Sequence, residues 1–442
     1  MKRLLILLIF LFIAVLKGDC FELIMPTERK NVTTNDYAFF YGKAKSAEDL
    51  TINGHSIYVA PNGAFAHTVK LQEGENRIMI KTLYGLLLYK FYKTIPEKLD
   101  IPTEDFQNAK AYVNKDNTPL RSTPVDAGLN RISHLFGGTH LIVNGSKGPF
   151  YRVVLSKDKE AWIAKKDVTL TDEGFYPADF INMNSERFKN AMIQTISFSK
   201  KLPYTIEDCE KEIIFRVYNP ELSDESIYNL NIPKPAKYAY TVTLDEGQYT
   251  FKVRKLPENL NETTVVIDAG HGGSEKGAVG CLGDEEKNIN LKIASLVADY
   301  LKRQDLNVIM TREIDADVSL EDRVKIAKEN DADIFVSIHL NSIGDVPMDV
   351  HKKRGTSVFY FNNSSKKLAE SIERHVTHQA GTRDDGVQTA SFAVIRPTEY
   401  NAVLVEAAYM TNPMDTMLYT KDKWIQKASK GISEGILQYL KK

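Results

Sequence analysis

The sequence predicts a multidomain protein in which β-rich N-terminal modules precede an α/β domain with a mostly parallel sheet flanked by helices. Three observations lead to this prediction. A chain of 442 residues is long enough for about three or four domains. Short strand-like segments separated by turn residues fill most of the chain as far as position 256. From Thr263 onward, strand-like and helix-like segments alternate, which is typical of a sheet covered on both faces.

The amino-acid composition argues against one class of binding partner and indicates what stabilises the fold. The chain has 57 basic and 58 acidic residues, so no large polycationic surface is expected, and nucleic acid is a poor candidate for its main partner. Hydrophobic residues make up 43% of the chain, which is enough for packed cores. The three cysteines do not form a disulfide framework, so we expect cores and a metal to stabilise the protein.

The first twenty residues have the pattern of a secretory signal peptide. Lys2 and Arg3 precede thirteen apolar residues, Leu4 to Leu16. A helix of that length spans about 20 Å, whereas the hydrocarbon core of a bilayer is roughly 30 Å thick. We therefore expect a signal peptide over residues 1–20, no stable membrane span, and a protein that is secreted across the cytoplasmic membrane. The alternatives are an uncleaved anchor and, less favoured, lipid attachment at Cys20.

The next segment, residues 21–95, predicts a β-sandwich-like module. Asn53-Gly54 is a hairpin signal, and strand-like stretches such as Ser56 to Ala60 flank the turns. The pattern weakly resembles the immunoglobulin-like modules of bacterial surface proteins, which implies no catalytic role. A charged, proline-containing linker is expected from Pro96 to Phe106.

Two further β-rich modules are predicted before the α/β domain. Residues 107–172 resemble the bacterial Src-homology-3-like barrels of cell-wall enzymes, on an opening "LRSTP" at Leu120 and a closing "AWI" at Ala161. An unrelated small barrel is the alternative. Residues 175–256 again read as strands, but they carry no recognisable ligand constellation.

In the α/β domain, residues 262–442, strands and helices follow the hydrophobic periodicity. The helix after the first strand has apolar residues at helical spacing, such as Ile289, Ile293 and Val297. Ser319 followed by Asp322 marks the start of another helix. The expected strands are Thr264 to Asp268, Asn307 to Thr311, Asp333 to Ile338, Thr356 to Phe361 and Ala402 to Ala407, and the other expected helices are Ser365 to His378 and Lys423 to Leu440.

Three potential metal ligands follow or end these elements. His271 comes directly after the first strand, Glu286 opens the first helix and His339 ends the third strand. In such folds, working residues gather on loops at the carboxyl ends of the strands. Two imidazoles and one carboxylate form a common catalytic zinc set that leaves the fourth position for water, so the pattern predicts Zn²⁺. A lone histidine would more simply be a packed polar group, and Glu285 could compete with Glu286 for the metal.

Glu406 is the fourth candidate, at the end of the apolar strand Ala402 to Ala407. A charged side chain at that position is costly unless it is paired or used. A carboxylate beside an activated water can take its proton and pass it to a leaving amine, which would make Glu406 catalytic. The alternatives are a solvent-facing side chain and an ion pair with Arg312 or Arg323.

The segments "VVIDAGHGGSEKGAVG", "EKNINL", "TREIDADVSLEDRVKIA", "DADIFVSIHLNS" and "AVLVEAAYMTNP" together resemble the zinc-dependent N-acetylmuramoyl-L-alanine amidases, which include the cell-separation amidases. The resemblance covers about Thr263 to Leu440. It implies zinc ligands at His271, Glu286 and His339 and a catalytic glutamate at Glu406. Ala269 departs from the proline usual in the first motif, and "EAAYMTNP" replaces the usual glycine-phenylalanine pairing after the glutamate.

The resemblance implies a peptidoglycan hydrolase that cleaves the amide between N-acetylmuramic acid and the L-alanine of the stem peptide by zinc-activated water. The β-rich modules would then hold the enzyme at the cell wall. Two rivals stay open. One is a catalytically silent wall-binding or regulatory protein with the same fold, and the other is a zinc peptidase that cuts within the stem peptide.

Overall fold

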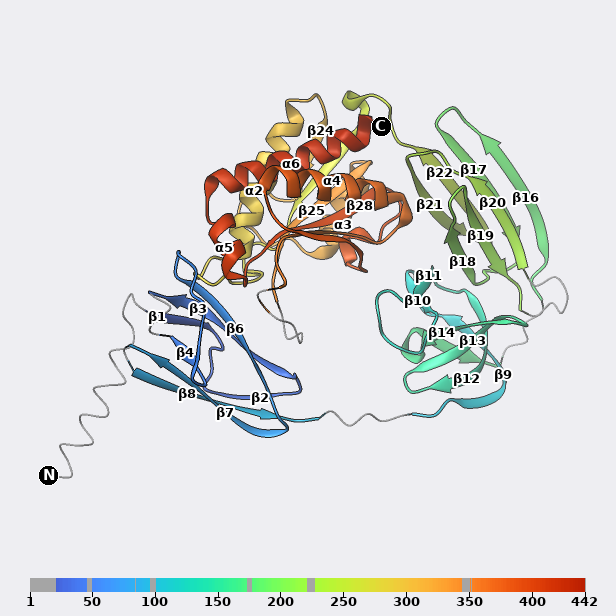
Figure 1. The fold of residues 1–442 in the computed structure, drawn as a ribbon. Helices are drawn as coiled ribbons and strands as arrows, with labels where there is room; N and C mark the ends of the chain where they lie inside the picture. The colour runs from blue at the N-terminus through green and yellow to red at the C-terminus, as the bar shows by residue number, and fades with distance from the viewer. Residues whose placement is uncertain are drawn as a thin grey trace.

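The structure is a computed structural model that describes residues 21–45, 50–83, 85–95, 101–172, 177–220, 227–343, 350 and 352–441. The predicted signal peptide, residues 1–20, lies outside the described residues. In the part of the chain that is described, no helix has both the length and the apolar character needed to cross a bilayer. The chain forms three β-rich units and a C-terminal α/β domain (Figure 1).

The first unit consists of two sheets, with strand orders β1-β3-β6 and β2-β8-β7-β4-β5. Side chains of β7 alternate between exposed and buried, so one face of its sheet packs on the core. Phe40, Ile52 and Phe65 are fully buried in this core. The strands are β1 (Phe21–Met25), β2 (Lys30–Thr33), β3 (Tyr37–Ala44), β4 (Thr51–Ile52), β5 (His55–Ser56), β6 (Ala64–Lys70), β7 (Gly74–Thr82) and β8 (Gly85–Lys93).

The second unit is a seven-stranded sheet with the order β11-β10-β14-β13-β12-β9-β15. β9 begins at Glu104, inside the segment predicted as a linker, because Glu104 and Asp105 pair with β12. A short 3-10 turn, η1 (Lys165–Asp167), precedes the last strand. The strands are β9 (Glu104–Val113), β10 (Thr118–Arg121), β11 (Arg131–Leu135), β12 (His140–Lys147), β13 (Phe150–Ser156), β14 (Lys159–Ala164) and β15 (Val168–Thr171).

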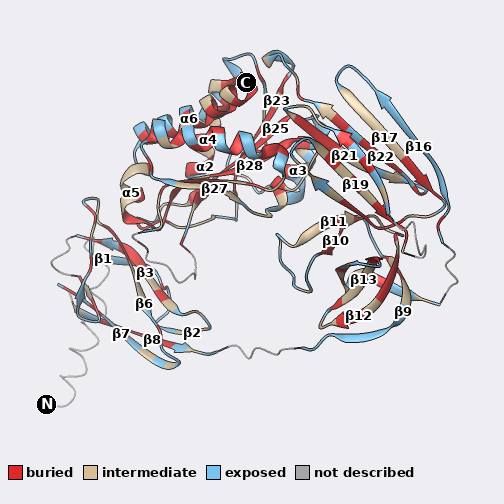
Figure 2. Ribbon diagram, turned by 45° about the vertical axis from the view of Figure 1, so that its right-hand side comes forward, coloured by how far each residue is buried: buried red, intermediate tan, exposed pale blue. Residues whose placement is uncertain are grey.

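The third unit has a four-stranded sheet, β16-β17-β22-β21, and a three-stranded sheet, β18-β19-β20. Its aromatic core, including Phe215 and Tyr249, is continuous with that of the second unit around Val143. β16 is exposed along its whole length (Figure 2). The strands are β16 (Phe180–Arg187), β17 (Ala191–Phe198), β18 (Tyr204–Asp208), β19 (Glu212–Tyr218), β20 (Ile227–Pro233), β21 (Tyr238–Asp245) and β22 (Gln248–Lys255).

The C-terminal domain is built on a six-stranded sheet with the order β24-β23-β25-β28-β26-β27. The sequence predicted a mostly parallel sheet, but the sheet is mixed, because β26 and β28 run antiparallel. Parallel strands need a long crossover, usually a helix, and no helix is described between β25 and β26. The strands are β23 (Thr264–Ala269), β24 (Asn307–Met310), β25 (Ile334–Asn341), β26 (Thr356–Tyr360), β27 (Asp384–Thr389) and β28 (Asn401–Tyr409).

Helices cover both faces of this sheet, and alternate residues of β23 show which helix lies on which face. Val265 and Ile267 pack in a core with α2, α4 and α6, whereas Val266 packs with α3 and the turn η4. The Ser319 side chain accepts a hydrogen bond from the Asp322 amide, as the helix start in the sequence predicted. The helices are α2 (Glu286–Lys302), α3 (Leu320–Glu329), α4 (Lys366–Ala380), α5 (Pro413–Tyr419) and α6 (Asp422–Lys441), with 3-10 turns η2 (Leu260–Glu262), η3 (Asn363–Ser365) and η4 (Ala393–Ile395).

The first unit packs on the C-terminal domain through apolar side chains. Tyr41, Ala64 and Ala66 are buried in one cluster with Cys281 and Tyr409. Cys281 lies in the loop before α2, and Tyr409 ends β28. The first unit therefore rests against segments that lead to two of the candidate site residues.

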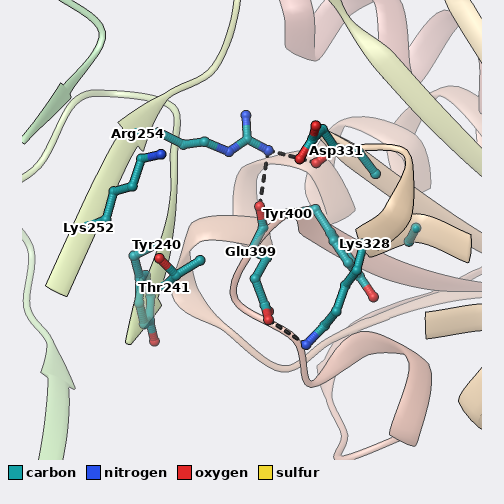
Figure 3. A pocket seen from close by; sticks show the side chains of 10 residues that line it. Tyr240, Thr241, Lys252, Arg254, Lys328, Asp331, Glu399 and Tyr400 are labelled. Carbon is teal, nitrogen blue, oxygen red and sulfur yellow. Dashed lines mark hydrogen bonds and ion pairs between the residues drawn. The ribbon is translucent and has the colours of Figure 1, made fainter. Parts of the chain in front are cut away.

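The third unit joins the C-terminal domain through a polar junction around a pocket of about 220 Å³ (Figure 3). Arg254 of β22 forms an ion pair with Asp333 and donates hydrogen bonds to the carbonyl oxygens of Ala332 and Glu399 at 2.6 and 3.0 Å. Lys328 pairs with the Glu399 carboxylate. These ion pairs and hydrogen bonds tie β22 to the C-terminal domain beside the pocket.

Candidate metal centre

His271, Glu286 and His339 are brought together at the carboxyl ends of β23 and β25. His271 follows β23 and has a left-handed backbone, with φ of 58°. Non-glycine residues are uncommon in this region and cluster at functional sites. Glu286 is the first residue of α2, and His339 lies in the last part of β25. Residues far apart in the sequence therefore meet because parallel strands end at one edge of the sheet.

The potential ligand atoms of these three residues all lie within 4.8 Å of one another. His271 Nε2 is 3.1 Å from Glu286 Oε2, and His339 Nδ1 is 2.9 Å from Glu286 Oε1. Glu286 is only 4% exposed, whereas both histidines are partly exposed. One side of the group is therefore anchored in the protein and the other is open to solvent.

This donor set fits a zinc ion. Zinc is held by imidazole nitrogens and carboxylate oxygens at about 2.0–2.2 Å, so ligand atoms of a tetrahedral site lie roughly 3.3 Å apart. Each histidine nitrogen lies near that distance from one of the two Glu286 oxygens, His271 at 3.1 Å from Oε2 and His339 at 2.9 Å from Oε1. Burial raises the pKa of Glu286, but hydrogen bonds and charge from His271 and His339 outweigh it and hold the pKa well below its usual range. The carboxylate is thus in the ionised form that a metal requires.

Two glycines leave room for the side chains of the group. A Cβ on Gly270 would lie 2.2 Å from the ring of His339. A Cβ on Gly277 would lie 2.4 Å from Glu286 Oε2 and 2.6 Å from the ring of His271. Gly277 also has a φ of 69°, which glycine adopts without strain. Close packing against backbone fixes the directions of all three side chains.

A buried ionic network holds the loop that carries His271. Asp268 pairs with Arg323 and accepts hydrogen bonds from Thr311 Oγ1 at 2.7 Å and Ser337 Oγ at 2.6 Å. Arg323 also donates to the carbonyl oxygens of Ala269 and His271 at 2.8 and 2.9 Å. The network ties the loop to α3 and β25, so it fixes the backbone of the site.

A second set of hydrogen bonds fixes the start of α2. Arg312 donates to the carbonyl oxygens of Gly270 and Lys287 at 2.9 and 2.8 Å. Asn290 donates to Glu286 Oε1 at 3.1 Å from one helical turn further on. These contacts orient the carboxylate without exposing it to solvent.

Glu406 lies beside this group on the next strand. It is the register partner of His339 in the parallel pairing of β25 and β28. Neighbouring strands lie about 4.8 Å apart, so the two side chains share one face of the sheet. Its Oε2 atom is buried and has no hydrogen-bond partner among the described residues. Burial, and secondarily the charge of Glu286, raises the pKa of Glu406 well above its usual value.

Neither arginine suggested by the sequence pairs with Glu406 in the described part of the chain. Arg323 pairs with Asp268, and Arg312 donates hydrogen bonds to backbone carbonyl oxygens. Glu285 pairs with Lys276 at 2.7 Å and does not join the histidines. Sequence reasoning missed the roles of Asp268 and Asn290. The one available signal was their polar character within apolar segments, which left the partner unspecified.

Comparison with known proteins adds a separate line of support. The family model for N-acetylmuramoyl-L-alanine amidase matches residues 265–438. The chain is also 38% identical over 186 residues to uncharacterized protein YqiI of Bacillus subtilis (strain 168), a match that covers 41% of this chain and 87% of YqiI. This chain belongs to the N-acetylmuramoyl-L-alanine amidase family. The resemblance of its C-terminal segments to that family is thereby confirmed.

Other relatives match the amidase domain alone. The N-acetylmuramoyl-L-alanine amidase LytC of Bacillus subtilis (strain 168) is 36% identical over 180 residues, which are 40% of this chain and about a third, 35%, of LytC. The solved catalytic domain of CwlV, an N-acetylmuramoyl-L-alanine amidase from Bacillus (Paenibacillus) polymyxa var. colistinus, is 36% identical. That likeness covers 40% of this chain and 98% of the CwlV domain, with a TM-score of 0.38.

Proposed function

We propose that this amidase is a zinc enzyme that hydrolyses the amide between N-acetylmuramic acid and the L-alanine of the stem peptide in peptidoglycan. The observation that carries the proposal is the meeting of His271, Glu286 and His339 with Glu406 as the neighbour of His339. Family membership supplies the substrate class. The chemistry of the four side chains supplies the reaction type.

His271, Glu286 and His339 would hold the zinc ion, since two imidazoles and a buried carboxylate are a catalytic zinc set. When bound, zinc lowers the pKa of water and polarises a carbonyl oxygen. The protein contributes a fixed donor geometry. Arg323 and Arg312 hold the backbone of the His271 loop, and Asn290 holds the Glu286 carboxylate.

Glu406 would move the proton. Hydrolysis adds hydroxide to the lactyl carbonyl carbon, breaks the bond from that carbon to the L-alanine nitrogen, and leaves one proton for the departing amine. A carboxylate with a raised pKa suits both halves of this transfer, because the best acid–base catalyst has a pKa near the working pH. Glu406 as a whole is partly exposed, and its buried Oε2 has no hydrogen-bond partner among the described residues, so no described ion pair or hydrogen bond holds that oxygen away from the reaction.

The place of action would be the cell wall, outside the cytoplasmic membrane. Two probable cell wall amidases named LytH, from Staphylococcus saprophyticus and Staphylococcus epidermidis, are among the relatives. We further propose that residues 1–20 are a signal peptide and that the three β-rich units hold the enzyme at the wall. Several weak contacts on one chain raise the effective concentration of substrate at the active site.

The products distinguish this function from its rivals. The full chain, incubated with purified peptidoglycan and zinc, should release stem peptides with a free L-alanine amino group, detected by mass spectrometry. Fragments cut inside the stem peptide would instead indicate a peptidase. If no peptide is released while the protein still sediments with the wall, the chain is a silent wall-binding protein.

A further inference from the structure

Three arginines meet at the junction between the second β-rich unit and the amidase domain. Arg121 and Arg131 are register partners on the antiparallel strands β10 and β11. Directly opposite residues on such strands share a face with Cβ atoms about 5 Å apart, and like charges placed there are destabilising. The fold therefore sets two positive charges side by side at the end of this hairpin.

The amidase domain contributes the third arginine, Arg396, from the loop between β27 and β28. Arg396 is held by Ser391, through hydrogen bonds to its hydroxyl at 2.9 Å and to its carbonyl oxygen at 2.8 Å. Ser391 in turn touches the hairpin that joins β10 to β11. A Cβ placed on Gly128 of that hairpin would lie only 2.5 Å from the Cβ of Ser391.

Electrostatics indicate that the three guanidinium groups act on one another. Burial and the charge of Arg121 lower the pKa of Arg131, and the charge of Asp126 only partly opposes them. Burial and the charges of Arg131 and Arg121 lower the pKa of Arg396. The positive charges of all three arginines act on His134 of β11. Burial and these charges lower its pKa to about 4, so it is neutral at pH 7.

The negative charge at this junction is smaller than the positive charge. Asp126 is mostly exposed and pairs with Arg121, which also donates hydrogen bonds to the Ala127 carbonyl oxygen at 2.6 Å and to Asn130 Oδ1 at 3.1 Å. Arg131 and Arg396 form no ion pair with any residue that the structure describes, and the Nε atom of Arg131 is buried without an acceptor. The junction of the third unit is different, because Arg254 there forms an ion pair with Asp333.

We propose that Arg121, Arg131 and Arg396 form a binding site for an oxyanion, a phosphate or carboxylate group, between the second unit and the amidase domain. Guanidinium groups bind such oxyanions through paired hydrogen bonds, and an anion would relieve the repulsion among the three charges. Free phosphate and a phosphate or carboxylate group on a wall polymer share this chemistry.

The site is separate from the metal centre. β27 runs parallel to β26, and β26 runs antiparallel to β28. The loop after β27 therefore lies at the end of the sheet where β28 begins, and Glu406 lies toward the other end, where β28 finishes. A bound anion would therefore link the two units without contacting Glu406. This proposal does not depend on the amidase activity.

Thermal unfolding of the full chain in sodium phosphate, sodium acetate and sodium chloride of equal ionic strength tests the proposal. Phosphate should raise the Tm of the parent above its value in chloride. Arg131→Gln and Arg396→Gln should each lose most of this rise and bind phosphate at least about tenfold more weakly by calorimetry. Arg303→Gln, which removes an exposed arginine at the end of α2, is the matched control and should keep the full rise.

The sign of the effect in chloride separates a ligand site from a structural role. Arg131→Gln should be at least as stable as the parent in chloride, because it removes a like-charge contact, and less stable than the parent in phosphate. A rise in acetate equal to that in phosphate would indicate a carboxylate source, and a rise in phosphate alone would indicate a phosphate source. The proposal is overturned if phosphate does not raise the parent Tm, or if both variants keep the whole rise.

Discussion

His339 and Glu406 are register partners on the adjacent parallel strands β25 and β28. The pairing sets a potential metal ligand and a carboxyl group of raised pKa on the same face of one sheet. In our account the two side chains have different tasks, since one binds the ion and the other moves a proton. The tasks can be separated by mutation.

Replacing Glu406 by glutamine should slow turnover strongly and spare metal binding. Proton transfer by a positioned side chain contributes about 10²–10⁴-fold to rate, so the rate of peptide release should fall by that factor. Zinc content and Tm should stay at or above the parent values, because the variant removes an acid whose ionised form is disfavoured by burial. Glu329→Gln, at the exposed end of α3, is the control and should retain full activity. A Glu406→Gln enzyme with near-parent turnover would rule out the assigned role.

Gly270→Ala should disrupt the metal centre through a steric clash with His339. The added methyl group would lie 2.2 Å from the ring of His339, well inside van der Waals contact, so the ring or the loop must move. We expect zinc affinity to fall at least about tenfold, as is typical when groups that orient ligands are changed. Zinc affinity can be measured by competition with a chelator, and circular dichroism should show the fold unchanged. Parent-like affinity would mean that this close packing does not set the position of His339.

Removing Asp268 should cost far more stability than removing an exposed partner. Asp268 is 1% exposed and pairs with Arg323, so Asp268→Asn leaves a buried guanidinium without its counter-charge. Losing one partner of a buried pair typically costs about 3–5 kcal/mol. Glu75→Gln breaks the exposed pair with Arg77, which solvent screens, and should leave the free energy of unfolding nearly unchanged. Urea unfolding of the two variants gives both values, and equal costs would contradict the network.

Glu373, which is not one of the metal-centre residues, should make the stability of the fold depend on pH in a predictable direction. Burial, with a hydrogen bond and charge from Asp384, raises its pKa from 4.5 to about 7. Between these values the folded chain binds more protons than the unfolded chain, so this group makes stability fall as pH rises from 4.5 to 7. The free energy of unfolding of Glu373→Gln minus that of the parent should therefore be larger at pH 8 than at pH 5.

The control for this test is Glu370→Gln, an exposed position on the same helix. It should follow the parent at both pH values in urea unfolding. If the difference between Glu373→Gln and the parent is the same at pH 5 and pH 8, the raised pKa of Glu373 is wrong.

The sequence predicted the three candidate ligands because each stands directly after or at the end of a strongly apolar segment, or opens an amphipathic helix. Strand ends and helix starts are local features, and the shared edge of the sheet follows from them. The strand direction at β26 was not predictable in this way. It depends on the connection from β25 to β26. A local pattern of hydrophobic residues is the same for a parallel and an antiparallel strand, so it does not predict the direction.

Two elements were missed for different reasons. β27 carries Asp384, Asp385 and Gly386, which give no apolar alternation, so only its pairing with β26 makes it a strand. The start of α5 could have been predicted from the sequence, because Asn412 caps the helix and Pro413 occupies its first turn.

The pairing of Asp268 with Arg323 could not be predicted from local sequence. It joins positions 55 residues apart, and such a contact is fixed by the tertiary fold.

Whether His271, Glu286 and His339 bind zinc can be measured as the metal content of the purified full chain, by mass spectrometry after dialysis against zinc and then buffer. We expect one zinc ion per parent chain, and close to none in His339→Ala or Glu286→Ala, because each variant removes one of three ligands. His378→Ala, on the surface of α4, should keep its zinc and serves as the control. A parent chain that binds no zinc, or a His339→Ala chain that binds it as well as the parent does, would contradict the account.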